Sequence, residues 1–497
     1  TTTTTTTTSN QSASSSSTTP NTDEQSTHLL SSQGGGGLAN VVLEENRIVN
    51  NMQLGVRIAK QSCVLVEGNT ISQNGLSGLF VAGGAQVTIE NNFIEENKEL
   101  GIRLCEQSSS LIASNTLIGN HLSSVFVTDQ SRATILSNTV RGSSQLGIRI
   151  GEKSEACIDN NVIEHNKMSG ILVTTQAIAS IEHNKVRCNG EFGVRVGEAS
   201  NVIVSENEIY ENVQSALSVT GASTTCMIRS NIIRKNKEAG VRVGEQAQST
   251  ASNNSISENA LSAVIVVSKA IVELEGNDIR ANQQSGVLIA GHAQCSLIHN
   301  TIEKNIHEGV TIKEESIVRF QYNRINENSA GIWIAEKSKA TVEHTQLIAN
   351  SAVGIYLCKQ STALLNDIDI TKSSKGLALS ENAQCRCESS RIKLSEWTVS
   401  VSNSSLLELV ESNISESQNS GLIVVGSQAL LERNDISQSK NAIDVRNQSK
   451  VELISNTIHD NQVCSIFTEK QSTCHLEQNH FRNNANGNIF EDGSIHN

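Results

Sequence analysis

Residues 92–104 read NFIEENKELGIRL, and variants of this phrase return about every 23 residues along the chain. The shared form is Asn-x-Ile/Val-x-x-Asn, followed by Gly-Ile/Val-x-Ile/Val. It occurs about 20 times with spacings of 22 to 24 residues, and its first position lies at Asn46, Asn69, Asn92, Asn115, Asn138, Asn161, Asn184, Asn207, Asn231, Asn254, Asn277, Asn300, Asn323, Thr345, Ile368, Ser390, Ser412, Asn434, Asn456 and Asn479. A period this short and constant indicates a solenoid.

The repeat has the pattern of short strands. Around Arg149, the apolar residues Ile148 and Ile150 alternate with polar ones, and β-branched residues dominate the inner set. Alternation with a period of two, broken by polar corner residues, indicates strands, whereas helical repeats have longer periods. The sequence therefore predicts an all-β fold: a right-handed single-stranded parallel β-helix solenoid of about 20 coils, each of 22–24 residues.

The recurrent polar and small residues have predicted structural roles. Asparagines at one corner, such as Asn69, Asn92 and Asn115, can form a stacked amide ladder. The repeated glycines are expected to supply a second sharp bend, at Gly55, Gly78, Gly101, Gly147, Gly170 and Gly193. Small residues take the glycine position at Ser124, Ala216 and Ala263.

Composition divides the chain into a linker and a single repeat domain. Residues 1–37 are rich in Thr, Ser and Gly and have too little apolar content to fold, which predicts a disordered linker. The chain has neither an initial Met nor a signal-like region, so we expect it to be part of a longer protein. Residues 38–497 are predicted to form one β-helix domain, with irregular coils or a loop in the stretch 366–411, which includes Trp397.

Charge and cysteine content limit the classes of partner and compartment. The net charge of −13 argues against nucleic acid, and no apolar stretch is long enough to span a membrane. The 11 cysteines are odd in number and contain no CxxC pair, and Cys385 and Cys387 have no nearby His. These features predict a reducing cytoplasmic or nuclear setting and no metal or cofactor.

A finer pattern repeats every second coil in an outward-pointing row. Arg alternates with aromatic or aliphatic residues along Arg57, Phe80, Arg103, Phe126, Arg149, Leu172 and Arg195, and Arg recurs at Arg242. Glu follows three residues after four of these arginines, at Glu106, Glu152, Glu198 and Glu245. One interpretation is a stacking device, in which each guanidinium lies on a neighbouring ring and pairs with Glu. The other is a recognition strip for a protein partner, and the two are compatible.

Catalysis is not expected from this sequence. Acidic residues do not recur at coil spacing, so nothing selects a pair of carboxylates for acid–base chemistry. Trp333 and Tyr356 lie on consecutive coils of the outward row and form a possible stacking site for a glycan. A polysaccharide-binding or polysaccharide-cleaving protein is therefore the alternative to an interaction scaffold.

The unit at 92–104 resembles the PbH1-type β-helix repeats of the pectate-lyase-like superfamily. Among its branches it is most similar to the intracellular non-enzymatic ones, the β-helical F-box receptors of ubiquitin ligases and the SHC SH2-domain-binding proteins. This resemblance implies that the β-helix captures a protein substrate, although the chain contains no F-box-like segment. We therefore expect a non-catalytic interaction scaffold with a lateral binding surface, with substrate recognition in a ubiquitin ligase as a special case.

Overall fold

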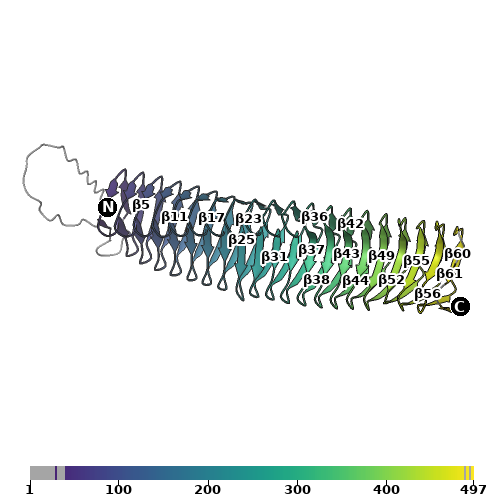
Figure 1. Ribbon diagram of the computed structural model, residues 1–497. Coiled ribbons are helices and arrows are strands. Elements are labelled where there is room, and N and C mark those ends of the chain that lie inside the picture. Colours follow the sequence, from purple (N-terminus) through teal and green to yellow (C-terminus); the bar gives the residue numbers. More distant parts are fainter. Residues whose placement is uncertain (1–27, 31–39, 486–488, 492–493, 497) are drawn as a thin grey trace, which may run out of the picture. The chain divides into compact units, whose positions relative to one another are not determined.

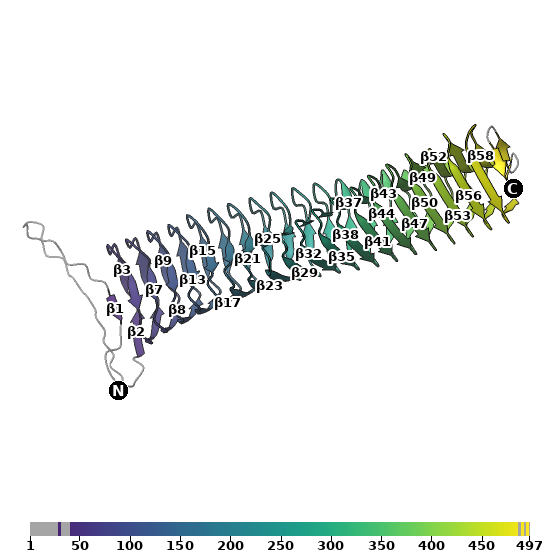
Figure 2. The same cartoon turned by 90° about the horizontal axis from the view of Figure 1, so that it is seen from below.

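The computed structural model describes residues 28–30, 40–485, 489–491 and 494–496. The described chain forms strands β1 to β62 and no helix. These strands make about 19 coils of a right-handed parallel β-solenoid with three parallel sheets, as the sequence predicted. Successive coils lie side by side within each compact unit (Figures 1 and 2).

The chain divides into two compact units, which are described separately. One unit contains residues 1–214 and 224–226, and the other contains residues 215–223 and 227–497. The prediction of a single domain over 38–497 stays a prediction.

Each coil contributes one strand to each of three sheets, here called A, B and C. In one coil of the first unit these are β16 (Ile148–Ile150), β17 (Glu155–Asp159) and β18 (Val162–Glu164). Sheet A of the first unit contains β1 (His28–Leu30), β4 (Val56–Ile58), β7 (Leu79–Val81), β10 (Ile102–Leu104), β13 (Val125–Val127), β16, β19 (Ile171–Val173) and β22 (Val194–Val196). Sheet B of this unit contains β2 (Asn40–Glu44), β5 (Cys63–Glu67), β8 (Gln86–Glu90), β11 (Ser109–Ala113), β14 (Arg132–Leu136), β17, β20 (Ile178–Glu182) and β23 (Asn201–Ser205). Sheet C of this unit begins at β3 (Arg47–Val49) and ends at β24 (Glu208–Tyr210).

The second unit repeats the three-sheet arrangement. Its sheet A contains β25 (Leu217–Thr220), β28 (Val241–Gly244), β31 (Val264–Val266), β34 (Val287–Ile289), β37 (Glu308–Ile312), β40 (Ala330–Ile334), β43 (Val353–Leu357), β46 (Lys375–Leu379), β49 (Trp397–Ser402), β52 (Ser420–Val425), β55 (Asn441–Arg446), β58 (Cys464–Thr468) and β61 (Ile489–Glu491). Its sheet B runs from β29 (Gln248–Ser252) to β62 (Ser494–His496), and its sheet C runs from β27 (Ile232–Arg234) to β60 (His480–Arg482).

The core consists of aliphatic rows that stack in register. Val125 pairs with Ile148 and Val127 with Ile150, and all four are fully buried. Because parallel strands in register place equivalent side chains directly over one another, each inner row is continuous within its unit. The outward position between two buried ones, such as Arg149, is free to vary.

The predicted amide ladder forms along the corner between sheets B and C. The backbone N–H of Asn138 donates to Oδ1 of Asn161 at 2.8 Å, and its Nδ2 donates to the same atom at 3.0 Å. The same Nδ2 also donates to the carbonyl oxygens of Ile112 and Leu136. The amide thus satisfies buried backbone groups that a strand ladder leaves open at a corner.

A second ladder follows the last Asn of the repeated phrase, at the corner between sheets C and A. Nδ2 of Asn97 donates to Oδ1 of Asn120 at 3.0 Å and to the carbonyl of Ile71 at 3.2 Å. The repeated phrase contains both asparagines, but only the first was predicted to form a ladder.

The repeated glycines lie at bends of the chain, as the sequence predicted, but a positive φ angle is not the reason for glycine there. Positive φ angles at the corners belong to polar residues such as Glu152, Lys153 and Asn160, whereas Gly147 and its equivalents do not have one. A Cβ on Gly147 would lie 2.5 Å from the carbonyl oxygen of Gly170 and 2.9 Å from a ladder amide. Glycine is therefore required because adjacent coils approach closely.

At one coil a serine replaces the glycine, and a neighbouring ladder residue is shorter to make room for it. Ser124 takes the glycine position, and the ladder residue of the following coil is Ser143 instead of Asn. The two hydroxyl oxygens are 2.7 Å apart and hydrogen bonded. The shorter ladder side chain leaves room for the side chain of Ser124.

The stretch 366–411 keeps three strands per coil, and no loop interrupts these described residues. The strands are β45 (Asp369–Thr371), β46, β47 (Gln384–Glu388), β48 (Arg391–Lys393), β49 and β50 (Leu406–Val410). Serine hydroxyls replace the amides of the ladder: the N–H of Ser390 donates to Oγ of Ser412 at 3.1 Å. The sequence phrase decays here because a shorter side chain can make the same bond.

Most of the predicted linker 1–37 lies outside the described residues. Within it, β1 pairs in parallel with β4, with Leu29 opposite Arg57. This strand differs from the predicted disorder, because the edge of β4 offers unpaired backbone groups. Among the residues that the structure describes, no helix is long and apolar enough to cross a membrane.

Candidate functional site

The outward row of sheet A in the first unit is the surface that the sequence singled out. Adjacent strands place its members in direct register: Arg57, Phe80, Arg103, Phe126, Arg149, Leu172 and Arg195. We call these seven residues the arginine–aromatic strip. Arg242 occupies the equivalent position in the second unit, so the structure does not group it with the strip.

Guanidinium groups in the strip lie against aromatic rings. The Cζ atom of Arg149 lies 4.6 Å from the centroid of the Phe126 ring, and that of Arg103 lies 5.5 Å from Phe80. The Cζ atom of Arg57 lies 6.0 Å from the centroid of the same Phe80 ring. Cation–π attraction of this kind is worth about 0.5–1 kcal/mol at exposed sites. The expected stacking of Arg on neighbouring rings is therefore confirmed.

The expected pairing of these arginines with Glu is not found. Among the ion pairs of the described first unit, none joins a strip arginine to a carboxylate. Glu152 instead accepts a hydrogen bond from Thr128 at 2.8 Å, and Glu198 accepts one from Thr175 at 2.9 Å. These threonines lie at the corner between sheets A and B, and they draw the carboxylates away from the guanidinium groups.

The structure brings together two carboxyl groups that the sequence analysis missed. Hydrogen bonding to Glu152 raises the pKa of Asp129, while the same bond and that from Thr128 lower the pKa of Glu152. The two carboxyl groups therefore interact as a pair, and Asp129 is the member that takes up a proton more readily. Asp129 and Glu152 occupy the same corner position in successive coils, a signal that coil-by-coil alignment of the sequence would have given.

In the second unit, the outward row contains the predicted aromatic pair. Trp333 and Tyr356 are paired in register, and their ring centroids lie 5.0 Å apart at an interplanar angle of 87°. Tyr356 packs against Ala330, Val353 and Ala378, and burial raises the pKa of its hydroxyl. Both rings are half-buried, so only part of their surface could contact a ligand.

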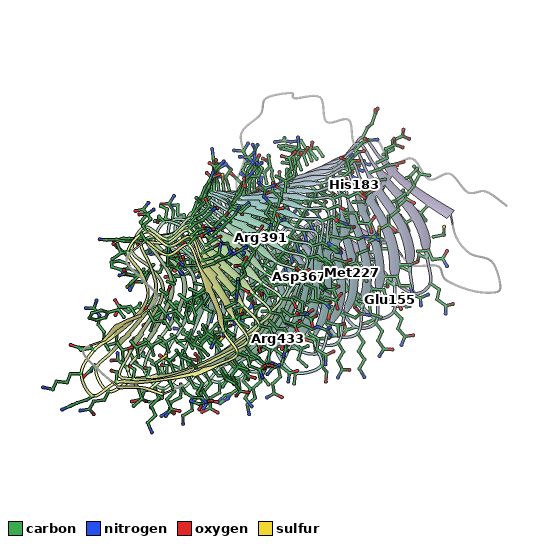
Figure 3. The ribbon with its side chains drawn as sticks, turned by 90° about the vertical axis from the view of Figure 1, so that its right-hand side faces the viewer. Glu155, His183, Met227, Asp367, Arg391 and Arg433 are labelled. Atoms are coloured by element: carbon green, nitrogen blue, oxygen red, sulfur yellow. The ribbon has the colours of Figure 1, made fainter. Side chains whose placement is uncertain are left out.

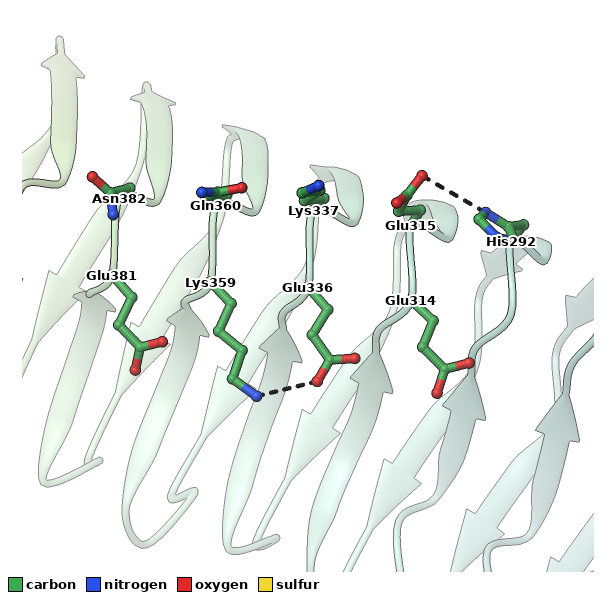
Figure 4. Close-up of a pocket in the computed structure, with 9 residues that line it drawn as sticks. All are labelled: His292, Glu314, Glu315, Glu336, Lys337, Lys359, Gln360, Glu381 and Asn382. Atoms are coloured by element: carbon green, nitrogen blue, oxygen red, sulfur yellow. Dashed lines mark hydrogen bonds and ion pairs between the residues drawn. The ribbon is translucent and has the colours of Figure 1, made fainter.

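A charged cleft of about 540 Å³ lies at the corner between sheets A and B of this unit (Figure 4). Lys359 Nζ lies 3.1 Å from Glu336 Oε1, and His292 Nδ1 lies 3.8 Å from Glu315 Oε2. Glu336 and Lys359 follow β40 and β43, the strands of the aromatic pair, whereas His292 and Glu315 follow β34 and β37. Internal ion pairs thus neutralise part of the cleft.

The described residues contain no group of three or more His, Cys, Asp or Glu that could hold a metal ion. The expectation of no cofactor stays a prediction. Cys385 and Cys387 are both buried inside their coil, and burial raises the pKa of each thiol.

Three solved structures are similar to the chain at low identity. The mannuronan C-5 epimerase AlgE4 A-module of Azotobacter vinelandii is 15% identical, over 67% of this chain and 87% of that one, with a TM-score of 0.36. A mutant of the periplasmic alginate epimerase AlgG is 13% identical, over 58% and 78%, with a TM-score of 0.40. The Vag8–C1 inhibitor complex is 12% identical, over 92% and 99%, with a TM-score of 0.43.

None of these three structures belongs to the F-box or SHC-binding branch that the sequence resembles. No curated protein matches the chain. The family model described as right handed beta helix region matches residues 21–145, 123–279, 239–392, 285–426 and 397–497. The matched segments cover nearly the whole sequence, and the chain therefore belongs to the right-handed beta helix region family.

Proposed function

We propose that the chain is a non-catalytic interaction scaffold, and that the arginine–aromatic strip of the first unit binds a protein partner. The observation that carries this proposal is the pair Phe126 and Arg149. The ring lies against the guanidinium, and no carboxylate of the described first unit lies within ion-pair distance of it.

The fixed positions of the strip arginines support this interpretation. The Nε atoms of Arg103 and Arg149 are buried and have no hydrogen-bond partner. A guanidinium that is fixed by stacking loses little entropy when a partner's acceptor arrives. Arg and aromatic side chains are also enriched among the residues that dominate protein interfaces.

The surrounding charge favours a protein over a polyanion. Glu106, Asp129, Glu152 and Glu198 lie beside the strip, and the whole chain has a net charge of −13. A phosphate backbone would be repelled by these carboxylates, whereas a protein can present mixed charges. The odd number of cysteines supports a reducing compartment, and we keep a cytoplasmic or nuclear location within the proposal.

The test is a capture experiment with two charge-matched variants. The strip variant is Arg103→Glu, Arg149→Glu and Arg195→Glu. The control variant reverses three exposed charges on sheet C of the same unit, Arg47→Glu, Arg141→Glu and Lys185→Glu. Circular dichroism must show that both are folded.

We expect wild type and control to retain a common partner that the strip variant loses. Recovery of the same partner by all three proteins would refute the strip as the binding surface. If ligase subunits co-purify with that partner, the special case of a ubiquitin-ligase receptor gains support.

A second candidate is a polysaccharide-binding or polysaccharide-cleaving protein. The specific observation in its favour is the carboxyl pair Asp129 and Glu152, whose pKa values are shifted in opposite directions, because paired carboxyl groups can act as acid and base. The aromatic pair Trp333 and Tyr356 could stack on a sugar ring. The test is to incubate the protein with a panel of acidic and neutral polysaccharides and to measure new reducing ends. Activity that Glu152→Gln abolishes would establish this candidate. If no polysaccharide gives a product, the protein does not cleave these polysaccharides and the catalytic version of this candidate is refuted.

A further inference from the structure

A trough lies on the outer face of sheet B in the first unit, away from the arginine–aromatic strip. It has a volume of about 680 Å³ and crosses β5, β8, β11, β14, β17 and β20. Small outward side chains such as Thr88, Ser109, Thr134 and Ser180 leave the sheet thinly covered there. The face is therefore hollow here because its outward side chains are small.

Large apolar groups stand exposed in the trough between these small residues. Leu111 is 37% exposed and Ile178 is 52% exposed, and both line it. Leu111 pairs in register with Thr88 on one side and Thr134 on the other, so its side chain has no bulky neighbour along its row. A side chain of a partner can fill the space on either side of it.

The outward row next to the trough, here called its wall, does not line it directly but has an ordered charge pattern. The last residue of each of these six strands lies in one row, which reads Glu67, Glu90, Ala113, Leu136, Asp159 and Glu182. Two carboxylates are thus followed by two apolar residues and then by two more carboxylates. The apolar pair lies beside Leu111 and the middle of the trough.

The carboxylates of the wall reach the trough. Glu182 Oε1 accepts a hydrogen bond from Ser180 Oγ at 2.6 Å, and Ser180 lines the trough. Burial and the negative charges of Asp159 and Glu182 raise the pKa of the Cys157 thiol, which lines it too. The carboxylates of the wall therefore act on groups inside the trough.

Other charges around the trough are largely neutralised. Arg132 and Glu155 form an ion pair of 3.1 Å on the opposite side, and Glu155 points outward from the ribbon (Figure 3). His183 lies 2.9 Å from Asp159 and 3.1 Å from Glu206, so it shares part of the charge of Asp159. Glu67, Glu90 and Glu182 have no cation of the described first unit within ion-pair distance.

We propose that this trough binds an extended peptide segment with two basic side chains six residues apart and apolar side chains between them. Glu67 and Asp159 are four coils apart, which is roughly 19 Å at a strand spacing of about 4.8 Å. An extended chain covers this distance in about six residues, and residues separated by an even number face the same side. The basic groups then meet the two carboxylate pairs, and the apolar groups meet Leu111.

The direct test measures binding of three capped, fluorescein-labelled peptides at low ionic strength, where exposed charges are least screened. The matching peptide is Lys-Ser-Leu-Ser-Leu-Ser-Lys. The spacing control, Ser-Leu-Ser-Lys-Lys-Leu-Ser, has the same composition with adjacent lysines, and the charge control replaces both lysines of the matching peptide by Glu. Fluorescence anisotropy should rank the matching peptide first, the spacing control second and the charge control last. Equal affinity for the two lysine peptides, or no binding of either, overturns the proposal.

Two variants locate the binding. Glu67→Lys with Glu182→Lys should weaken the matching peptide by about tenfold or more, because both attractions become repulsions. The control Glu95→Lys with Glu208→Lys makes the same charge change on sheet C and should leave the affinity unchanged. Equal loss in both variants would reduce the effect to net charge and overturn the trough as the site.

A second readout does not depend on these variants. Cys157 is exposed in the trough, so the matching peptide should slow its alkylation by iodoacetamide, measured residue by residue by mass spectrometry. Unchanged alkylation at saturating peptide would place the binding elsewhere. The other possible occupant is a second copy of this chain, which sedimentation of the protein alone tests. If the wild type is a dimer and the variant Glu67→Lys with Glu182→Lys is a monomer, the trough binds a second copy and the peptide proposal is overturned. All of these results are independent of the arginine–aromatic strip.

Discussion

Replacement of Asn161 by alanine should destabilise the solenoid far more than replacement by serine. Asn161 accepts hydrogen bonds from the backbone N–H and Nδ2 of Asn138, at 2.8 and 3.0 Å. Its own Nδ2 donates to the carbonyls of Ile135 and Asp159 and to Oδ1 of Asn184, at 2.8, 2.9 and 2.9 Å. Asn161→Ala removes all five bonds at a buried corner.

The magnitude follows from the groups left without a partner. A buried backbone donor or acceptor that loses its only hydrogen bond costs about 1–3 kcal/mol. The N–H of Asn138 loses its acceptor and the carbonyl of Ile135 loses a donor, whereas the carbonyl of Asp159 keeps its bond from the N–H of Ser137; we expect Asn161→Ala to cost about 3–5 kcal/mol. The chain itself shows what serine can replace: Oγ of Ser412 accepts from the N–H of Ser390 and donates to the carbonyl of Val410. Asn161→Ser should therefore cost about 1–2 kcal/mol.

Urea unfolding followed by circular dichroism gives the change in midpoint, and hydrogen exchange gives the local effect at the Asn138 amide. Midpoints are compared instead of extrapolated free energies, because a solenoid can unfold in parts. Equal midpoints for the two variants would refute the reasoning, as would an Asn138 amide that stays protected in Asn161→Ala. Either result would mean that the hydrogen bonds of the ladder do not stabilise the corner.

Three further predictions concern the coil spacing, the carboxyl pair and the thiols. Gly170→Ala should lower the free energy of unfolding by about 1–3 kcal/mol, because the new Cβ would lie 2.8 Å from a carbonyl oxygen of the next coil. The control Gly151→Ala should not destabilise the protein, because its Cβ would lie 3.7 Å from the nearest atom. Equal urea midpoints for the two variants would contradict the close approach of the coils as the reason for glycine. The raised pKa of Asp129 means that its protonated form stabilises the fold and that this stabilisation is lost as pH rises through that pKa. Asp129→Asn removes this loss, so the urea midpoint should decrease less between acid and neutral pH than in wild type. Parallel pH profiles of the two proteins would contradict the raised pKa of Asp129. Iodoacetamide at mildly alkaline pH should modify exposed Cys157 in the folded protein, whereas Cys226, whose pKa burial raises to about 12, should react only after unfolding; comparable native rates would show that the coil interior opens.

The repeated phrase was sufficient to predict the fold class, because each of its positions reports a local constraint. Buried pairs such as Ile148 and Ile150 give the strand period, and Asn138 and Asn161 mark the corner that the backbone cannot close alone. Stacking of the arginines on rings was predictable for the same reason, since register in a parallel solenoid follows from coil length. Arg149 over Phe126 is the direct result.

Other features depended on distances that a one-dimensional pattern does not contain. The bend at Gly147 was predicted, but the reason for glycine there was not: a Cβ would lie 2.5 Å from the carbonyl oxygen of Gly170 in the next coil. The glutamates after the arginines looked like ion-pair partners, yet Thr128 and Thr175 bind Glu152 and Glu198 instead. Competition between a neighbouring hydroxyl and a guanidinium is decided by side-chain direction at the corner, which alternation alone does not give.

The sequence by itself determined that this chain winds into a parallel β-solenoid, because a constant period and alternating burial leave one way to stack short strands. It also determined which residues point outward. Only the tertiary structure decided what those outward residues form together: a strip in which Arg149 is stacked without a direct ion pair, an interacting carboxyl pair of Asp129 and Glu152, and a trough around Leu111. The physical reason is that inward side chains must be apolar and buried in every coil, which the sequence pattern shows directly. Outward side chains form a site only through contacts with side chains about 23 residues away, on adjacent coils.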